Sequence, residues 1–189
     1  MPNGITEEEL SLLIQNTKNG DLRSFELIVK SFQRYTMTIA FRILYDENDA
    51  RDIVQEGFIR VWKHIGNYNH AIKFSTWLYK IIVNLSIDRL KSRKKLSRFF
   101  FKSSEEIDPV DCSDLEREYS NKETAGLIKL FAGKLPEKQR VIFVLRDLEE
   151  LSVSEVADIT GLSESSVKTN LFHARRNIRE KIIGYENEK

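Results

Sequence analysis

Helical periodicity runs through almost all of this 189-residue chain and narrows the folds open to it more than any other feature. Apolar residues recur at three- and four-residue steps, the spacing that gives a helix one buried face. No stretch sustains the apolar–polar alternation of a half-buried strand. Proline, which interrupts helices, occurs only at positions 2, 109 and 136. The sequence therefore predicts an all-α protein.

An acidic segment divides this helical pattern into two units. Residues 103–120 hold seven acidic side chains against Arg117 alone, with Pro109 and four serines among them. That composition is typical of a linker rather than of a packed element. We therefore predict two small helical domains joined by a flexible acidic linker. The expected parts are an N-terminal extension (1–20), a first domain (21–98), the linker (99–122), a second domain (123–184) and a tail (185–189).

The overall composition indicates a globular protein but does not show whether it binds nucleic acid. Hydrophobic residues make up 41% of the chain, enough for real cores, and the net charge is only +1. Nucleic-acid binding must therefore be judged from where the cations lie. Cys112 is the only cysteine, so no internal disulfide can form. The N-terminus has no signal-peptide pattern and no apolar run reaches the length of a membrane span, so we expect a cytoplasmic protein without membrane insertion.

The second unit has the outline of a helix-turn-helix. Ser152 and Glu155 fit a capping box for its first helix. Gly161 stands where that helix must end, and Ser163 can cap the second helix. A solvated cationic face is the alternative explanation for the second helix, but the caps and the turn favour binding in a major groove of DNA. The expected buried stripe of the second helix consists of Val167, Leu171, Ala174, Ile178 and Ile182.

A helix predicted over about 74–95 combines aromatic residues at its start with cations at its end. Rings beside cations suit single-stranded nucleic acid, because bases stack on the rings while the cations follow the backbone. Phe74 and Trp77 are nevertheless expected to lie in the core, whereas Tyr68, in the preceding loop, is expected to be less buried. An earlier helix is predicted over about 49–65, with Asn48 or Asp49 as its cap. The residues off the apolar stripe of the 74–95 helix are Tyr79, Asn84 and Asp88.

The chain contains, in this order, DARDIVQEGFIRVWKHI (49–65), FSTWLYKIIVNLSIDRLKSRKK (74–95), the acidic linker and LPEKQRVIFVLRDLEELSVSEVADITGLSESSVKTNLFHARR (135–176). This ordered set resembles bacterial RNA polymerase sigma factors of the sigma-70 family. The subgroup it resembles most is the small, two-domain extracytoplasmic-function (ECF) subfamily. The resemblance implies that the first unit is sigma region 2, a helical bundle, and the second is sigma region 4.

The resemblance also implies a role for each surface. The outward face of the 49–65 helix would dock on the coiled coil of the polymerase's largest subunit. The 66–73 loop, with Asn84 behind it, would recognise the −10 element and hold a flipped base. The loop sequence NYNHAIK lacks the Arg-Gly-Asp/Glu character common in relatives, which leaves the −10 preference open. The candidate core-binding residues are Asp49, Asp52, Gln55 and Glu56. The candidate −10 residues are Asn67, Tyr68, Asn69, Trp77, Asn84, Arg89, Lys91, Arg93 and Lys94. The candidate −35 residues are Ser165, Ser166, Lys168, Thr169, Phe172, Arg175 and Arg176.

The predicted function is that of a promoter-specificity subunit, which binds RNA polymerase core, recognises the −35 and −10 elements and helps to melt the promoter. Its expected partners are the core, through the largest-subunit coiled coil and the flap, and promoter DNA as duplex and melted strand; an anti-sigma factor is a further candidate. Two alternatives stay open: a stand-alone helix-turn-helix regulator, which would give residues 49–95 no role, and a regulatory protein without promoter selectivity. Catalytic and metal-ligand patterns are missing from the sequence, so no enzymatic activity, cofactor or metal is expected.

Overall fold

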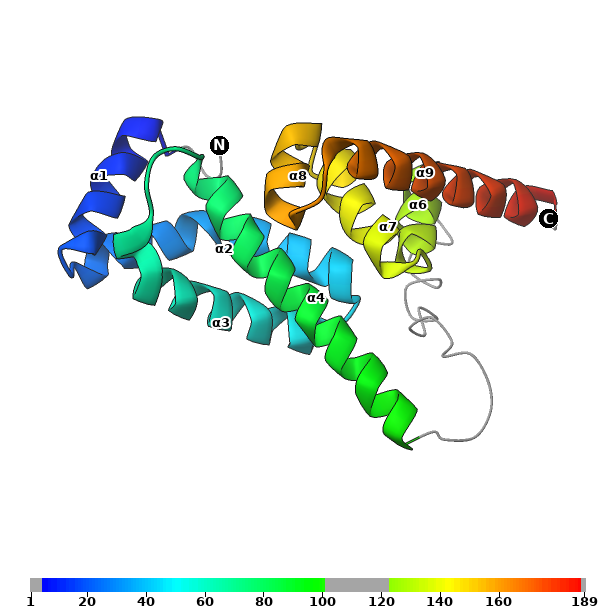
Figure 1. The fold of residues 1–189 in the computed structure, drawn as a ribbon, viewed down its shortest axis with the longest axis horizontal. Coiled ribbons are helices and arrows are strands. Elements are labelled where there is room, and N and C mark those ends of the chain that lie inside the picture. Colours follow the sequence, from blue (N-terminus) through cyan, green and yellow to red (C-terminus); the bar gives the residue numbers. More distant parts are fainter. Residues whose placement is uncertain (1–4, 101–122, 188–189) are drawn as a thin grey trace.

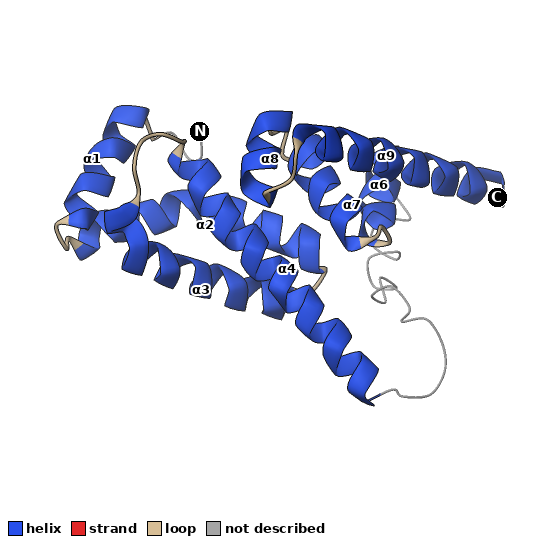
Figure 2. Cartoon of the chain, in the orientation of Figure 1, coloured by secondary structure: helices blue, strands red, loops and turns tan. Residues whose placement is uncertain are grey.

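The computed structural model describes residues 5–100 and 123–187. Within these two ranges every regular element is a helix and no strand occurs, which confirms the predicted all-α class (Figure 2). The helices form two domains, as predicted. The linker predicted over 99–122 lies outside the described residues except for residues 99 and 100, and so does Cys112.

The first domain is a bundle in which the long helices α2 (Leu22–Leu44), α3 (Glu47–His64) and α4 (Phe74–Phe100) pack against one another, and α1 (Glu7–Lys18) packs on α2 (Figure 1). Gly57 permits the close approach of α3 and α4, because a Cβ atom on Gly57 would collide with Cδ1 of Ile82. The elements are α1 (Glu7–Lys18), α2 (Leu22–Leu44), α3 (Glu47–His64), the short 3-10 helix η2 (Ile65–Asn67) and α4 (Phe74–Phe100).

Helix α1 lies in the segment that the sequence analysis treated as an N-terminal extension. Thr6 and Glu9 form a capping box at its start: Thr6 Oγ1 accepts from the N–H of Glu9 at 3.1 Å, and Glu9 Oε2 accepts from the N–H of Thr6 at 2.9 Å. Leu10 and Ile14 are buried where α1 packs on α2. The extension is therefore part of the first domain rather than an appendage to it.

The junction between α2 and α3 differs from the prediction. Neither Asn48 nor Asp49 caps α3; Asp46 does, and its Oδ1 accepts from the N–H of Asp49 at 2.8 Å. The reason is Tyr45, which ends α2 with a φ of 52° and turns the chain sharply. Asp46 is then the first residue with extended backbone, the conformation that a cap requires.

The second domain contains the predicted helix-turn-helix. Its capping box is present: the N–H of Ser152 donates to Glu155 Oε2 at 3.0 Å, and the N–H of Glu155 donates to Ser152 Oγ at 3.2 Å. Gly161 ends the first helix with a φ of 70°, and Ser163 Oγ accepts from the N–H of Ser166 at 3.2 Å, as a cap should. The elements are α6 (Glu123–Gly133), α7 (Glu137–Phe143), the π-helical turn η3 (Val144–Leu148), α8 (Val153–Thr160) and α9 (Glu164–Asn187).

The two domains pack together, with α8 against α4 and η3 against α2 (Figure 1). Helix α4 also has a second buried face, roughly 150° around the helix axis from the expected stripe. Tyr79, which the sequence analysis placed off the apolar stripe, lies on this second face and is 7% exposed. Its burial depends on the other domain, so the periodicity of α4 alone could not reveal it. The other buried residues of this second face are Thr76, Val83, Ser86 and Leu90.

Candidate nucleic-acid interface

The second helix of the helix-turn-helix, α9, presents an exposed face along its N-terminal half. Lys168, Thr169 and Phe172 are exposed there, and Phe172 keeps 63% of its surface in solvent. A large ring in water is unfavourable by itself, but such a ring can cover a thymine methyl group in a major groove. The opposite face carries the predicted stripe: Val167, Leu171, Ala174 and Ile178 are buried and Ile182 is half-buried.

Ser165 and Ser166 lie in the first turn of α9, where small side chains permit the close approach of a phosphate or a base edge. Ser165 is exposed. Ser166 is half-buried. Its N–H donates to Ser163 Oγ at the helix cap, and its carbonyl accepts from Asn170 Nδ2 at 2.8 Å. Ser165 is therefore the better placed of the two for contact with DNA.

Within the described residues, the ion pairs of Lys168 and Arg176 are weak and lie in solvent. Lys168 lies 3.5 Å from Glu164, and Arg176 lies 3.6 Å from Glu180. Exposed pairs one turn apart on a helix contribute about 0.3–0.5 kcal/mol, so a DNA phosphate can replace the carboxylate in each. Both side chains are thus available for the contacts predicted for them.

Arg175 is held more firmly than its neighbours. Its Nε and Nη2 donate to the two carboxylate oxygens of Asp147, at 2.8 and 2.7 Å, and these hydrogen bonds raise the pKa of Arg175. A two-point pair of this geometry is stronger than a single exposed contact. Arg175 thus ties α9 to η3, and a phosphate would have to compete with Asp147 for it.

Tyr68 corrects the expectation drawn from its position in a loop. The ring is only 5% exposed and packs on Phe74 and Trp77, with ring centroids 5.4 and 5.3 Å away. Its hydroxyl donates to the carbonyl of Ile72 at 2.9 Å, and its burial raises the pKa of the phenol. Lys18 Nζ also donates to the carbonyl of Tyr68 at 2.7 Å. Tyr68 therefore anchors the loop to the core, and it cannot serve as an open stacking surface for a base.

The other residues predicted for the −10 element are spread over the 66–73 loop and α4. Phe74 is buried, as expected, while Trp77 is only half-buried. Asn67 and Asn69 are exposed in the loop. Asn84 is exposed as well, but it lies about 15 Å along the helix axis from Phe74, since each residue adds about 1.5 Å. The loop and Asn84 therefore do not form one compact pocket.

Asp49 links the α3 surface predicted for core binding to the α4 residues predicted for the −10 element. It was expected to face outward for core binding, but its side chain is only 14% exposed. Arg89 Nη1 donates to Asp49 Oδ1 at 2.7 Å, and Arg93 pairs with both Asp49 and Asp46. The outward assignment of Asp49 is thus wrong: it belongs to an ion-pair network with two residues predicted to bind DNA.

Lys91 and Lys94, also on α4, are more exposed to solvent than Arg89 and Arg93. Lys91 is exposed and lies 3.4 Å from Asp88 one turn away. Lys94 pairs with Glu137 of α7, at 2.8 Å, so its partner lies in the second domain. Of the four cations predicted for the −10 region, Lys91 is the one that no other helix engages through a described ion pair.

The outward face of α3 holds the remaining residues predicted for core binding. Asp52 and Gln55 are exposed, and Glu56 is half-buried beside Arg60. Ile59 lies on the same face, one turn further, and is 54% exposed. Sequence reasoning missed Ile59, although its place four residues after Gln55 and off the apolar stripe was the signal. An exposed isoleucine among polar side chains can supply the apolar contact at the centre of a docking surface.

These observations define a two-domain helical protein whose second domain is a helix-turn-helix suited to DNA. Comparison with known families goes further: residues 28–96 match sigma-70 region 2, and residues 125–178 match sigma-70 region 4. The chain belongs to the sigma-70 family of RNA polymerase sigma factors, within the ECF subfamily.

Relatives of this chain match it over nearly their whole length. The ECF RNA polymerase sigma factor SigW of Bacillus subtilis is 30% identical over 182 residues, which cover 89% of this chain and 94% of SigW. The RNA polymerase sigma-H factor of Pseudomonas aeruginosa is 27% identical over 183 residues, which cover 92% of this chain and 94% of the sigma-H factor. The sigma factor RpoE of Bartonella quintana, solved with the anti-sigma factor NepR, has the same fold, with a TM-score of 0.66 at 17% identity over 84% of this chain and 96% of that one. Among the described residues, no helix combines the length and apolarity needed to cross a membrane.

Proposed function

We propose that this chain carries out the tasks of a promoter-specificity subunit through three separate surfaces. Helix α9 reads the −35 element, the 66–73 loop and α4 engage the −10 region and help to melt it, and α3 docks on the polymerase core. The proposed partners are the core, through its largest-subunit coiled coil and flap, promoter DNA as duplex and melted strand, and an anti-sigma factor. Because RNA polymerase acts in the cytoplasm, we place the action of the chain there, as an initiation factor rather than an enzyme.

The exposed face of α9 carries this proposal. Lys168, Thr169 and Phe172 combine a cation, a small hydroxyl and a ring within the first turns of a helix whose opposite side is buried. A helix docked in a major groove needs one exposed face that carries both kinds of contact. Polar and apolar side chains recognise base edges and thymine methyl groups, and cations bind the phosphates. Arg176 extends the same face with a weakly held guanidinium.

For the −10 region we favour Asn67, Asn69 and Lys91, with Trp77 as a partly accessible ring. For the core we favour Asp52, Gln55 and Ile59, a patch in which an apolar side chain stands among polar ones. A basic partner helix would complement this patch electrostatically, and Ile59 would supply the apolar contact that a stable interface needs.

Reconstituted transcription tests the proposal. Purified protein is added to sigma-free bacterial core polymerase with a pool of genomic promoter fragments, and the transcript starts are sequenced. The expected result is a set of starts that share a −35 and −10 pair. Lys168→Ala should reduce initiation at these promoters by roughly 5- to 150-fold, the range for losing one specific contact.

Lys181→Ala is the matched control, because Lys181 is an exposed lysine about 20 Å further along α9. It should leave initiation nearly unchanged. If Lys168→Ala and Lys181→Ala behave alike, the assignment of the α9 face to −35 recognition is wrong. If the protein binds one DNA site tightly without core and supports no initiation with it, the chain acts as a stand-alone regulator instead.

A further inference from the structure

Lys18, the last residue of α1, reaches the loop proposed for the −10 element. Its Nζ donates to the carbonyl of Tyr68 at 2.7 Å and lies 5.8 Å from the centre of the Tyr68 ring. Lys18 is half-buried, and 50 positions of sequence separate it from Tyr68. Figure 1 shows the loop running beside α1 toward the start of α4, and α1 also contacts η2. One side chain thus joins the first helix of the domain to the beginning of the loop.

The end of α1 is a rigid base for this contact. Ile14 is buried, where α1 packs on α2. Gly20 has a φ of 92°, and its N–H donates to the carbonyl of Thr17 at 2.9 Å, so the chain turns at once into α2. Asp21 then caps α2. Because both sides of this turn are fixed, the side chain of Lys18 extends toward the loop from a fixed point.

The ammonium group of Lys18 has no carboxylate partner among the described residues. Its described partners are the carbonyl and the ring of Tyr68. Lys73, by contrast, is largely exposed and pairs with Glu155. An exposed ion pair exchanges easily with water, whereas a half-buried ammonium that left its carbonyl would lose a charge-assisted hydrogen bond. The position of the Tyr68 carbonyl is therefore coupled to α1.

The loop beyond Tyr68 is otherwise tied mainly to itself. The Tyr68 hydroxyl donates to the carbonyl of Ile72 at 2.9 Å, and the N–H of Ala71 donates to Asn69 Oδ1 at 3.1 Å. Both hydrogen bonds shape the loop, but neither connects it to another helix. For residues 68–72, the bond from Lys18 is the described hydrogen bond that makes such a connection.

A loop held in this way can meet a base with its side chains already in place. His70 is exposed, and its ring lies 5.2 Å from the Tyr68 ring at 66°. Asn67 is exposed on the other side of Tyr68. Moving a base out of the stack is unfavourable, so the contacts that receive it must offset that cost. A loop that also had to become ordered at that moment would bind the base more weakly.

We propose that Lys18 is a positioning residue for the −10 loop: by holding the carbonyl of Tyr68, it keeps residues 66–73 in the form that receives the melted strand. Lys18 does this without touching DNA. The recognition part of this inference rests on the proposed function, because it takes the loop as the reader of the −10 element. The tie between α1 and the loop does not rest on it and is measured without DNA. Helix α1, predicted only as an extension, thereby takes part in promoter melting.

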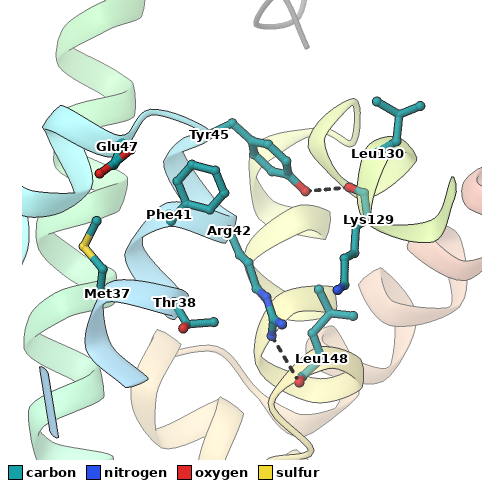
Figure 3. Close-up of a pocket in the computed structure, with 9 residues that line it drawn as sticks. All are labelled: Met37, Thr38, Phe41, Arg42, Tyr45, Glu47, Lys129, Leu130 and Leu148. Carbon is teal, nitrogen blue, oxygen red and sulfur yellow. Dashed lines mark hydrogen bonds between the residues drawn. The ribbon is translucent and has the colours of Figure 1, made fainter. Parts of the chain in front are cut away.

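Three variants isolate the tie. Lys18→Met keeps an unbranched apolar stem against the Tyr68 ring but removes the donor. Lys18→Arg keeps a donor for the carbonyl. Tyr45→Phe is the matched control, because the Tyr45 hydroxyl donates to the carbonyl of Lys129 at the same distance of 2.7 Å (Figure 3). It also removes one hydrogen bond to a backbone carbonyl, but outside the surfaces proposed for DNA and core.

Hydrogen exchange of the free, full-length protein tests the tie itself. The N–H groups of Tyr68 and Ala71 are hydrogen-bonded and report on the loop. In Lys18→Met their exchange should become about tenfold faster, because hydrogen bonds of charged groups are the stronger ones. Exchange in α2 should not change, and Tyr45→Phe should leave both loop amides as they are. Equal loop exchange in Lys18→Met and the wild type overturns the tie.

Binding of the −10 strand tests the recognition part. The probe is a fluorescent single-stranded oligonucleotide with the −10 sequence of a promoter found in the transcript-start experiment. It is titrated onto the complex of each full-length variant with sigma-free core. Lys18→Met should weaken binding about tenfold, whereas Lys18→Arg and Tyr45→Phe should bind close to the wild-type level. Affinity for core should be the same for all. An equal loss of affinity for core and for the strand would make Lys18 a structural residue and overturn the proposal.

Salt dependence separates positioning from a direct phosphate contact. A lysine that neutralises a phosphate of a single strand contributes about 0.7 to the slope of log affinity against log salt concentration. Lys18→Met should weaken binding at every salt concentration without changing this slope. A smaller slope would show that Lys18 contacts the strand, which overturns the positioning role. If the wild-type complex binds no −10 strand and starts no transcripts, the proposed function and the recognition part both fail, while faster loop exchange in Lys18→Met still supports the tie.

Discussion

At the scale of single residues, Asp49 shows how one carboxylate can decide which cations are available. Its oxygens accept from Arg89 and pair with Arg93, while Asp46 shares Arg93 at 2.8 Å. Both arginines lie on the helix proposed for the −10 region, so their charge is already partly neutralised by α3. Lys91, on the same helix, has only Asp88 at 3.4 Å as a described ion-pair partner. The duplex-binding strength of α4 should therefore depend more on Lys91 than the number of cations suggests.

Asp49→Asn is expected to lower the free energy of unfolding by about 1–3 kcal/mol, because two partly enclosed guanidinium groups lose their carboxylate. Thermal denaturation of the full chain would report this as a fall in the melting temperature of about 2–12 °C. The exposed Asp52→Asn is the matched control: it should change stability by less than about 0.5 kcal/mol but weaken core binding. A stable Asp49→Asn protein that binds core poorly would restore Asp49 to the docking surface.

At the scale of elements, the start of α3 is stabilised by a charge as well as by a cap. The N–H of Asp49 donates to Asp46, and Arg93 lies against the same side chain. These contacts, the hydrogen bond first, hold the pKa of Asp46 below its ordinary value of 3.8. An acid whose pKa is lower in the folded state stabilises the fold in its ionised form. Its contribution is complete above the unfolded pKa and is lost as the pH falls through the folded one.

Asp46→Asn isolates this contribution, because asparagine caps a helix about as well as aspartate but carries no charge. Above about pH 4 the wild type should be the more stable protein, and its advantage should shrink to zero as the pH falls below that value. Urea denaturation at a series of pH values from 7 to about 2.5 would measure the difference. The same series on Asp52→Asn supplies the background for removing an exposed carboxylate. A constant difference at every pH would show that Asp46 acts only as a cap.

Elements that depend on local chemistry were predictable from the sequence, and those that depend on distant partners were not. Ser152, Glu155 and Gly161 act within a few residues of one another, so the pattern of the helix-turn-helix could be read directly. Tyr79 is buried by a domain that begins more than 40 residues later, and nothing in the periodicity of α4 records that contact. Tyr68 shows the opposite error, because a loop position was taken as a sign of exposure although the ring packs on Phe74.

At the scale of the whole molecule, the contact between the two domains combines interactions that respond differently to salt. Lys73–Glu155 and Lys94–Glu137 are largely exposed on the lysine side, so added salt should screen them. Arg42–Glu149 is more enclosed and should resist screening. The apolar residues near this pair, including Phe41 and Leu148, are indifferent to moderate salt. The contact between the domains is therefore a mixed interface whose outer ion pairs contribute less than its centre.

The packing of the two domains should accordingly survive salt that abolishes promoter binding. Between 50 mM and 500 mM NaCl, the radius of gyration of the free protein should rise only slightly, because exposed pairs contribute about 0–1 kcal/mol each. Over the same range, binding of the polymerase–protein complex to promoter DNA should fall steeply, since each phosphate contact releases counterions. Lys73→Ala, which removes one exposed pair, should leave the radius of gyration close to the wild-type value at low salt. Expansion of the wild type in parallel with the loss of DNA binding would instead mean that the exposed lysines, rather than the pair of Arg42 and Glu149, hold the domains together.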